Sequence, residues 1–203
     1  MEIRENIAGV TVWHPLTISP LVGEMGRFTI GAETAADITA RDTLLDRAVG
    51  PNWRRKASEK LRRGRIPSEG LAFVARDIKG DVVGTVRLWD VTAGNLHSSA
   101  LLLGPLAVDP LLKGAGIGSA LMRHAIHEAE KRGHGAILLV GDAPYYERFG
   151  FSSEKTRNLA MPGPYEPRRF LALELAAGAL DGAHGVLRPA GRKMKPAALG
   201  VAA

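Results

Sequence analysis

Three glycines at alternating positions, Gly114, Gly116 and Gly118, stand immediately before a segment with a helical pattern. From Ile117 onward apolar residues recur at a 3.6-residue period, which predicts an amphipathic helix. The first amides of a helix have no partner within the helix and lie at the positive end of its dipole. Glycines at this point remove the side chains that would keep an anion away from those amides. The pattern therefore indicates a phosphate-binding turn.

The spacing excludes two common phosphate-binding motifs. A P-loop needs lysine and then serine or threonine after its last glycine, whereas here Ser119 follows Gly118 directly. The dinucleotide-binding fingerprint needs two residues between its second and third glycines, and here Ile117 stands alone between them. A glycine-rich helix start that binds no ligand is the alternative interpretation.

The chain around this turn resembles the GNAT superfamily of N-acetyltransferases. The acetyl-CoA signature of that family, Gln/Arg-x-x-Gly-x-Gly/Ala, aligns with residues 113–118, where Lys113 replaces the usual glutamine or arginine. GPLAVDP before the turn and GAILLVGDAPYYERFGF after it resemble the fourth strand, the fifth strand and the following helix of the family. LVGD paired with YYERFGF, and a late RFLALEL, resemble the bacterial YhbS-like branch over about residues 28–190.

The resemblance implies an α/β fold, a single domain with a mixed, splayed central sheet flanked by helices. Apolar runs separated by turn residues predict strands and helices along the chain that agree with this fold. Strands are expected from about residue 27 and over residues 71–76, 81–91, 101–108, 134–141 and 170–175. Helices are expected from about residue 37 to 48, over 53–63, from residue 117, and after residue 144.

Gly104-Pro105 interrupts the apolar strand expected over residues 101–108. Proline cannot donate to a sheet and glycine tolerates distortion, so the pair predicts a bulge or a splayed edge. In the GNAT family the pantetheine arm of acetyl-CoA inserts between the splayed fourth and fifth strands. The cofactor-binding residues implied by the resemblance are Leu106, Ala107, Val108, Lys113, Gly114, Ala115, Gly116, Ile117, Gly118, Ser119, Asp142, Pro144 and Tyr145.

Tyr146 occupies the position of the family's general-acid tyrosine. The resemblance implies that its hydroxyl protonates the departing thiolate. An aromatic side chain that only packs at a helix start is the alternative. No general base is evident, because the strand at residues 101–108 has no carboxylate; His97, Asp142 and Glu69 are candidates, and a water chain to bulk solvent is an equal alternative.

Composition excludes several classes of protein. The chain has no cysteine, which excludes disulfides, a thiolate nucleophile and cysteine metal sites. No apolar run is long enough for a membrane span and no secretory pattern begins the chain, so a cytoplasmic protein is expected. His124 and His127 have the spacing of metal ligands, but a solvated helix face is the favoured interpretation and no metal is expected. No nucleophile motif is present, which favours direct transfer over a covalent acyl-enzyme.

The formal net charge of +6 is uneven. Residues 52–65 alone carry a net charge of +6, and residues 184–203 add four basic residues without an acid. Such patches attract anions such as CoA phosphates or RNA, although a solvated helix face and tail are the favoured interpretation. Arg168 and Arg169 are candidates to bind an acidic acceptor, and solvated loop arginines are the alternative.

Three regions are expected: an extension over residues 1–26 outside the core, the acetyltransferase domain over residues 27–190, and a mobile basic tail over residues 191–203. The leading hypothesis is an acetyl-CoA-dependent N-acetyltransferase, a monomer or homodimer without a membrane partner. Its acceptor would be a primary amine of a small molecule or peptide. An acyl-CoA-binding module without turnover and an acetyltransferase for an RNA-linked amine are the alternatives.

Overall fold

The computed structural model describes residues 3–7, 10–14, 28–50, 53, 57–94 and 98–194. Near the N-terminus β1 (Ile3–Ile7) and β2 (Val10–His14) pair antiparallel in a two-stranded sheet of their own. Both strands lie within the extension expected over residues 1–26. That the extension lies outside the core stays a prediction.

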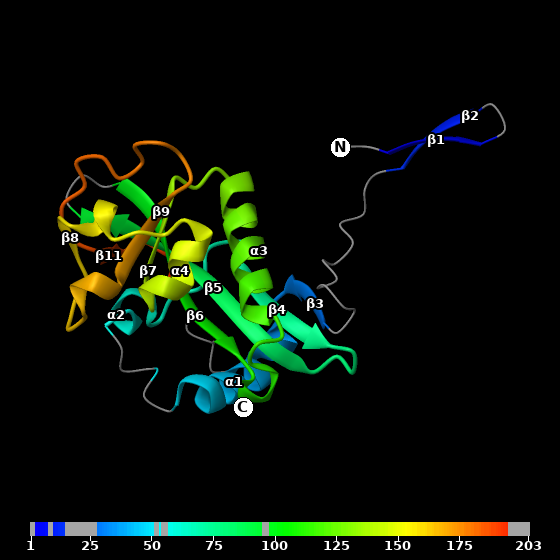
Figure 1. The fold of residues 1–203 in the computed structure, drawn as a ribbon, viewed down its shortest axis with the longest axis horizontal. Coiled ribbons are helices and arrows are strands. Elements are labelled where there is room, and N and C mark those ends of the chain that lie inside the picture. Colours follow the sequence, from blue (N-terminus) through cyan, green and yellow to red (C-terminus); the bar gives the residue numbers. More distant parts are fainter. Residues whose placement is uncertain are drawn as a thin grey trace, which may run out of the picture.

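A seven-stranded sheet forms the centre of the molecule (Figure 1). Its order is β3-β4-β5-β6-β7-β9, with β11 pairing with β5 beyond the end of β4. Strands β6 and β7 are parallel and every other neighbouring pair is antiparallel, so the sheet is mixed. The strands are β3 (Phe28–Ala32), β4 (Ala72–Asp77), β5 (Val82–Ala93), β6 (Ser98–Val108), β7 (Ala136–Val140), β9 (Phe170–Glu174) and β11 (Arg188–Pro189).

Four α-helices accompany the sheet in the described part of the chain: α1 (Ile38–Val49), α2 (Glu59–Arg62), α3 (Ile117–Lys131) and α4 (Ala143–Tyr146). Helix α3 buries the predicted apolar stripe of Ile117, Leu121, Met122, Ala125 and Ala129. Helix α2 is one turn long, whereas the sequence predicts a helix over residues 53–63; residues 54–56 lie outside the described residues. The predicted α/β fold with a mixed sheet is confirmed.

Alternation along β6 and β7 distributes apolar side chains to both faces of the sheet. Leu101 and Leu103 pack on the α3 side, while Leu102 packs in a second cluster on the opposite face. Ile137 and Leu138 in β7 divide between the two clusters in the same way. Both strands are therefore buried on both faces, which explains their almost uninterrupted apolar sequence.

The Gly104-Pro105 pair shifts the register of β6, as its sequence predicts. Leu88 on β5 faces Leu103, whereas Val86 faces Leu106, so two residues of β5 span three of β6. The indole Nε1 of Trp89 donates to the Gly104 carbonyl oxygen at 2.6 Å. Leu103 and Leu106 consequently pack toward the same cluster despite their odd spacing. The Gly104-Pro105 peptide bond is cis.

The C-terminal segment returns to the core. Strands β8 (Leu159–Ala160) and β10 (Gly185–Val186) pair in parallel before β11 joins β5. Beyond it, the amide of Ile66 donates to the carbonyl of Arg192 and the amide of Met194 donates to that of Gly64, both at 2.9 Å. Residues 191–194 are thus paired with the core instead of beginning a tail, and residues 195–203 lie outside the described residues.

Candidate active site

Strands β6 and β7 pair only briefly before they separate. Their register covers Leu101 with Ile137 and Leu102 with Leu138, and in the described chain neither strand pairs with the other beyond that point. A cavity of about 410 Å³ occupies the splay. It is lined by Val49, Ser58, Arg62, Leu103, Gly104, Pro105, Leu106, Leu139, Val140, Gly141, Asp142, Tyr145, Tyr146 and Arg169.

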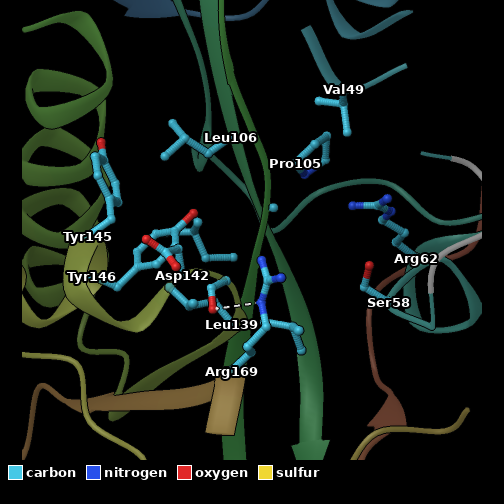
Figure 2. Close-up of a pocket in the computed structure, with 14 residues that line it drawn as sticks. Val49, Ser58, Arg62, Pro105, Leu106, Leu139, Asp142, Tyr145, Tyr146 and Arg169 are labelled. Carbon is cyan, nitrogen blue, oxygen red and sulfur yellow. Dashed lines mark hydrogen bonds between the residues drawn. The ribbon is translucent and has the colours of Figure 1, made fainter. Parts of the chain in front are cut away.

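Figure 2 shows that the cavity has two walls of different origin. Asp142, Tyr145 and Tyr146, at the start of α4 and within it, form one wall. The opposite wall comes from α1, α2 and the bulge of β6, while the side chain of Arg169 rises between the walls from the position just before β9. Leu106, Asp142 and Tyr145 of the predicted cofactor site are therefore brought together with the predicted catalytic residue, Tyr146.

Tyr146 lies against the end of β7. A Cβ atom on Gly141 would overlap Cε2 of the Tyr146 ring, so a glycine is needed for the ring to occupy this position. No hydrogen-bond partner of the Tyr146 hydroxyl is present among the described residues. Burial raises the pKa of Tyr146 to about 12, so the hydroxyl keeps its proton at neutral pH. Tyr146 can therefore donate a proton into the cavity.

Arg169 fixes the backbone on which Tyr146 rests. The amide of Gly141 donates to the Arg169 carbonyl oxygen at 2.9 Å, and Arg169 Nε donates back to the Gly141 carbonyl at 3.2 Å. The positive charge of Arg169 also acts to lower the pKa of Tyr146, against the larger effect of burial. Arg169 is thus a positioning residue for the tyrosine as well as part of the lining.

The predicted phosphate-binding turn has the necessary backbone. Gly114 and Gly116 have φ angles of 89° and 80°, in the left-handed region that favours glycine, and a Cβ on either would meet nothing within 4 Å. Lys113 is exposed beside them. Of the six successive amides at residues 114–119, five lack an intrachain acceptor among the described residues, and the sixth, that of Ala115, donates to the Leu112 carbonyl. The free amides are those of Gly114, Gly116, Ile117, Gly118 and Ser119.

Gly118 connects this turn to the cavity. A Cβ on Gly118 would lie 2.8 Å from the Tyr145 hydroxyl oxygen and 3.5 Å from the Val108 side chain, so α3 begins in close contact with α4. The start of α3 and the Tyr145 wall therefore form one continuous surface. The predicted phosphate-binding turn at residues 113–119 therefore lies next to the Tyr145 side of the cavity.

Several other residues of the predicted cofactor site do not line the cavity. Ile117 is 2% exposed and packs in the core, and the Ala107 side chain packs with Leu45 of α1. Pro144 is exposed and Ala115 packs partly against the core; neither lines the cavity. Ala107 and Val108 are not among the residues that line this cavity, and their place along the pantetheine arm stays a prediction.

Sequence reasoning missed the second wall. The interpretation of residues 52–65 as a solvated face does not hold for Arg62, which is 6% exposed and lines the cavity. Arg168 and Arg169 also differ: Arg169 lines the cavity, whereas the Arg168 side chain is 85% exposed and borders a separate hollow. No spacing rule distinguishes these arginines, because their burial depends on segments far away in the chain.

A second cavity of about 510 Å³ adjoins the first through shared lining residues Ser58, Val140 and Arg169. Tyr165 and Glu166, from the proline-rich loop before β9, lie in its wall. The sequence predicts that this loop borders the acceptor pocket. The two cavities together give room for a cofactor arm and a second substrate.

Comparisons with known proteins decide the family. Residues 68–153 match the family described as acetyltransferase (GNAT) domain. The chain is 29% identical over 158 residues to the N-acetyltransferase YhbS of Escherichia coli K12, which covers 78% of this chain and 93% of that protein. The crystal structure of E. coli YhbS in complex with CoA matches with a TM-score of 0.70, 28% identity and coverage of 81% of this chain and 90% of that one.

Residues 68–153 form a GNAT acetyltransferase domain, and the chain is similar to YhbS over most of its length. It is an acyltransferase. A GNAT acetyltransferase from Brucella melitensis in complex with acetyl-CoA also matches, with a TM-score of 0.53, 26% identity and coverage of 76% of this chain and 98% of that chain. The resemblance seen in the glycine turn and the segment after it is confirmed at the level of the family.

The three candidates for a general base differ in where the structure places them. His97 lies outside the described residues. The Glu69 side chain is 85% exposed, interacts with Arg192 at 3.3 Å and lies outside the cavity lining. Asp142 lines the cavity beside Tyr146. Of the candidates that the structure describes, Asp142 alone is placed to act on a substrate in the splay.

The remaining expectations concern metals and membranes. Within the described residues, no three His, Cys, Asp or Glu side chains gather closely enough to hold a metal ion. His124 packs edge-on against Phe73 at 4.5 Å between ring centroids, and burial lowers its pKa, which favours the neutral ring. None of the helices in the described ranges has the length and apolar character needed to cross a membrane.

Proposed function

We propose that this protein is an acetyl-CoA-dependent N-acetyltransferase that moves an acetyl group directly to a primary amine. The observation that carries this proposal is the position of Tyr146 in the cavity between β6 and β7, where its phenol can donate a proton. The CoA and acetyl-CoA complexes of the two similar structures support the identity of the acyl donor.

The cofactor would lie along the α4 wall. The free amides of Gly114 and of residues 116–119 would bind the pyrophosphate at the start of α3, and Lys113 would add a point charge. From there the pantetheine arm would pass Tyr145 and enter between the unpaired edges of β6 and β7. Its amide groups would pair with these edges as a strand would. The proposed binding residues are the thirteen named from the sequence, with Ile117 and Ala107 acting through their backbone.

The reaction would then proceed without a covalent enzyme intermediate. The amine nitrogen attacks the thioester carbonyl carbon, and backbone amides at the β6 edge stabilise the negative charge that develops on the carbonyl oxygen. The C–S bond breaks as the Tyr146 hydroxyl gives its proton to the leaving sulfur. The attacking nitrogen loses a proton to Asp142 or to water, and Tyr146 regains one from solvent. The products are the N-acetylated amine and CoA with a free thiol.

The test measures acetyl transfer to defined amines. Purified protein is incubated with acetyl-CoA and a panel of primary amines, thiol release is followed, and acetylated products are detected by mass spectrometry. We expect thiol release to depend on the amine and to match the amount of N-acetyl product. Saturable CoA binding without amine-dependent thiol release would contradict the proposal and favour a binding role.

A further inference from the structure

One wall of the cavity carries a buried cation with unused hydrogen-bonding capacity. Arg62 is 6% exposed, and its Nε donates to Glu59 on the same helical turn at 2.6 Å. A guanidinium has five N–H donors, and arginine is rarely buried without partners. No hydrogen bond from the Arg62 Nη groups is found among the described residues, and the side chain lines the cavity.

Neighbouring residues contact the Arg62 guanidinium, but among the described residues they do not accept hydrogen bonds from its Nη groups. The Cζ atom of Arg62 lies 5.8 Å from the centroid of the Trp53 ring, and a Cβ atom on Gly104 would lie 3.9 Å from Nη1 of Arg62. Burial acts most strongly on the Arg62 pKa and lowers it, while Glu59 acts in the opposite direction. The charge is therefore held at a cost, and an anion in the cavity would offset that cost.

A second cation reaches the same space. Arg169 lines both cavities, with Nη1 3.7 Å from Glu166 and with Nε on the Gly141 carbonyl. Figure 2 shows Arg62 facing the cavity from α2 and the guanidinium of Arg169 rising into it from below. Among the described residues that line the first cavity, Asp142 is the single carboxylate beside the two guanidinium groups, and Glu59 pairs with Arg62 through Nε alone.

The position of Arg62 indicates that it would contact the acceptor and not the cofactor. Tyr145 contacts Gly118 at the start of α3, which places the proposed cofactor path on the α4 wall. Arg62 lies on the opposite wall, next to Ser58, which also lines the second cavity. A group bound by Arg62 would thus face the thioester from the side that the cofactor leaves open.

Resting on the transfer reaction proposed above, we infer that the acceptor is an anionic amine, with a carboxylate or phosphate group that Arg62 binds. The planar guanidinium suits either group, because two N–H donors can pair with two oxygens at once. Arg169 adds attraction where the two cavities meet. A second ammonium group on the acceptor would meet like charges and bind poorly.

Matched amines test the class of acceptor. Thiol release from acetyl-CoA is compared for n-butylamine, 4-aminobutanoate and 1,4-diaminobutane, and for ethanolamine and phosphoethanolamine. We expect kcat/KM for at least one anionic member to exceed that of its neutral partner by about tenfold or more, and the diamine to be the poorest of its set. The two sets distinguish carboxylate from phosphate.

Variants connect the preference to Arg62. Arg62→Gln should raise KM for the preferred anionic amine by about tenfold, with kcat and the neutral amine changed less than about threefold. Arg168→Gln, with its exposed side chain outside both cavities, is the matched control and should retain the preference. Glu59→Gln with Arg62→Gln removes both members of the ion pair and provides a folded test if the single variant is unstable.

The outcomes separate this inference from the proposed function. If no amine accelerates thiol release, the transfer reaction is contradicted and the acceptor class with it. If neutral and anionic amines react equally, or if the preference survives Arg62→Gln, acetyl transfer stands and the anionic acceptor is contradicted.

Discussion

The two walls of the cavity are built in opposite ways. The cofactor wall comes from β6, the glycine turn, α3, β7 and α4, which follow one another along the chain, and it offers mainly backbone amides and gaps left by glycine. The opposite wall, which we propose for the acceptor, carries Val49, Ser58 and Arg62, and Arg169 rises between the two walls; these four residues come from separate segments and offer side chains. Residues 68–153 match the GNAT family, and these four residues all lie outside that range.

This difference indicates that cofactor binding depends mainly on the backbone and acceptor selection mainly on side chains. Backbone geometry serves an invariant task, because a pyrophosphate and a pantetheine arm need donors and space but no particular side chain. The acceptor must be distinguished from other amines, and side-chain charge and shape do this. Changes on the first wall should therefore alter cofactor binding and chemistry, while changes on the second should alter acceptor choice.

The largest effect should follow loss of the proton donor on the cofactor wall. Tyr146→Phe keeps the ring against Gly141 and removes only the hydroxyl. A thiolate gains from a proton only as the C–S bond breaks, so the loss should appear in the transition state. We expect kcat to fall by roughly a hundredfold with acetyl-CoA affinity changed less than about threefold. Steady-state kinetics and calorimetry measure the two quantities.

One kinetic result would contradict the role of Tyr146 as the general acid. If chemistry is shown to limit the rate and kcat stays within twofold, Tyr146 is a packing residue. The cofactor wall would then bind acetyl-CoA without supplying the acid.

The phosphate turn should give the next largest effect. Gly116→Val places a branched side chain in the open space over the amides, so acetyl-CoA should bind at least about tenfold more weakly. Because φ is 80°, the variant also carries backbone strain of about 1–2 kcal/mol. Gly80→Val is the matched control, since Gly80 has a φ of 88° and open space in the turn after β4. Unchanged affinity in Gly116→Val by calorimetry would remove the turn from the cofactor site.

The same contrast explains what the sequence could predict. The apolar stripe of α3, the bulge at Gly104-Pro105 and the glycine turn follow from local periodicity and backbone chemistry, and the structure contains all three. The burial of Arg62 depends on Trp53 and on the β6 bulge, which no local pattern connects. Arg168 and Arg169 are adjacent in the short 3-10 turn Pro167–Arg169 before β9, and the backbone direction of that turn decides which one points inward.

Gly141→Ala tests whether the end of β7 positions the tyrosine. The added methyl group would overlap the Tyr146 ring, and the φ of Gly141 is outside the left-handed region, so displacement of the ring is the main effect. We expect kcat to fall by about tenfold with cofactor affinity nearly unchanged. In the double variant with Tyr146→Phe the two losses should not add, because both act through one hydroxyl. Full additivity in kcat would contradict this role.

Lys113 should matter less than the amides beside it. Its flexible, exposed ammonium adds a point charge to donors that are already in place. Lys113→Ala should therefore weaken acetyl-CoA binding by about 1 kcal/mol, roughly fivefold, and the loss should shrink as salt is raised. Lys79→Ala, in the exposed turn after β4, controls for the loss of one surface charge. A loss in Lys113→Ala as large as that in Gly116→Val would mean that side-chain charge, not backbone, dominates this wall.

The smallest expected effect is an absence of change at alkaline pH. An ordinary tyrosine would lose its proton near pH 10, and a general acid of that kind would lose activity there. Burial raises the pKa of Tyr146 to about 12, so its protonated, active form persists below that pH and is lost only as the pH passes through it. Deprotonation of the amine favours attack as pH rises, so kcat for acetyl transfer should stay level or increase between pH 8 and pH 10. A stopped assay over this range, with Tyr146→Phe alongside, measures the profile. If the rate falls near pH 10 in the unaltered protein and not in Tyr146→Phe, the tyrosine is the acid, but its hydroxyl is not shielded from water in the way that its raised pKa requires.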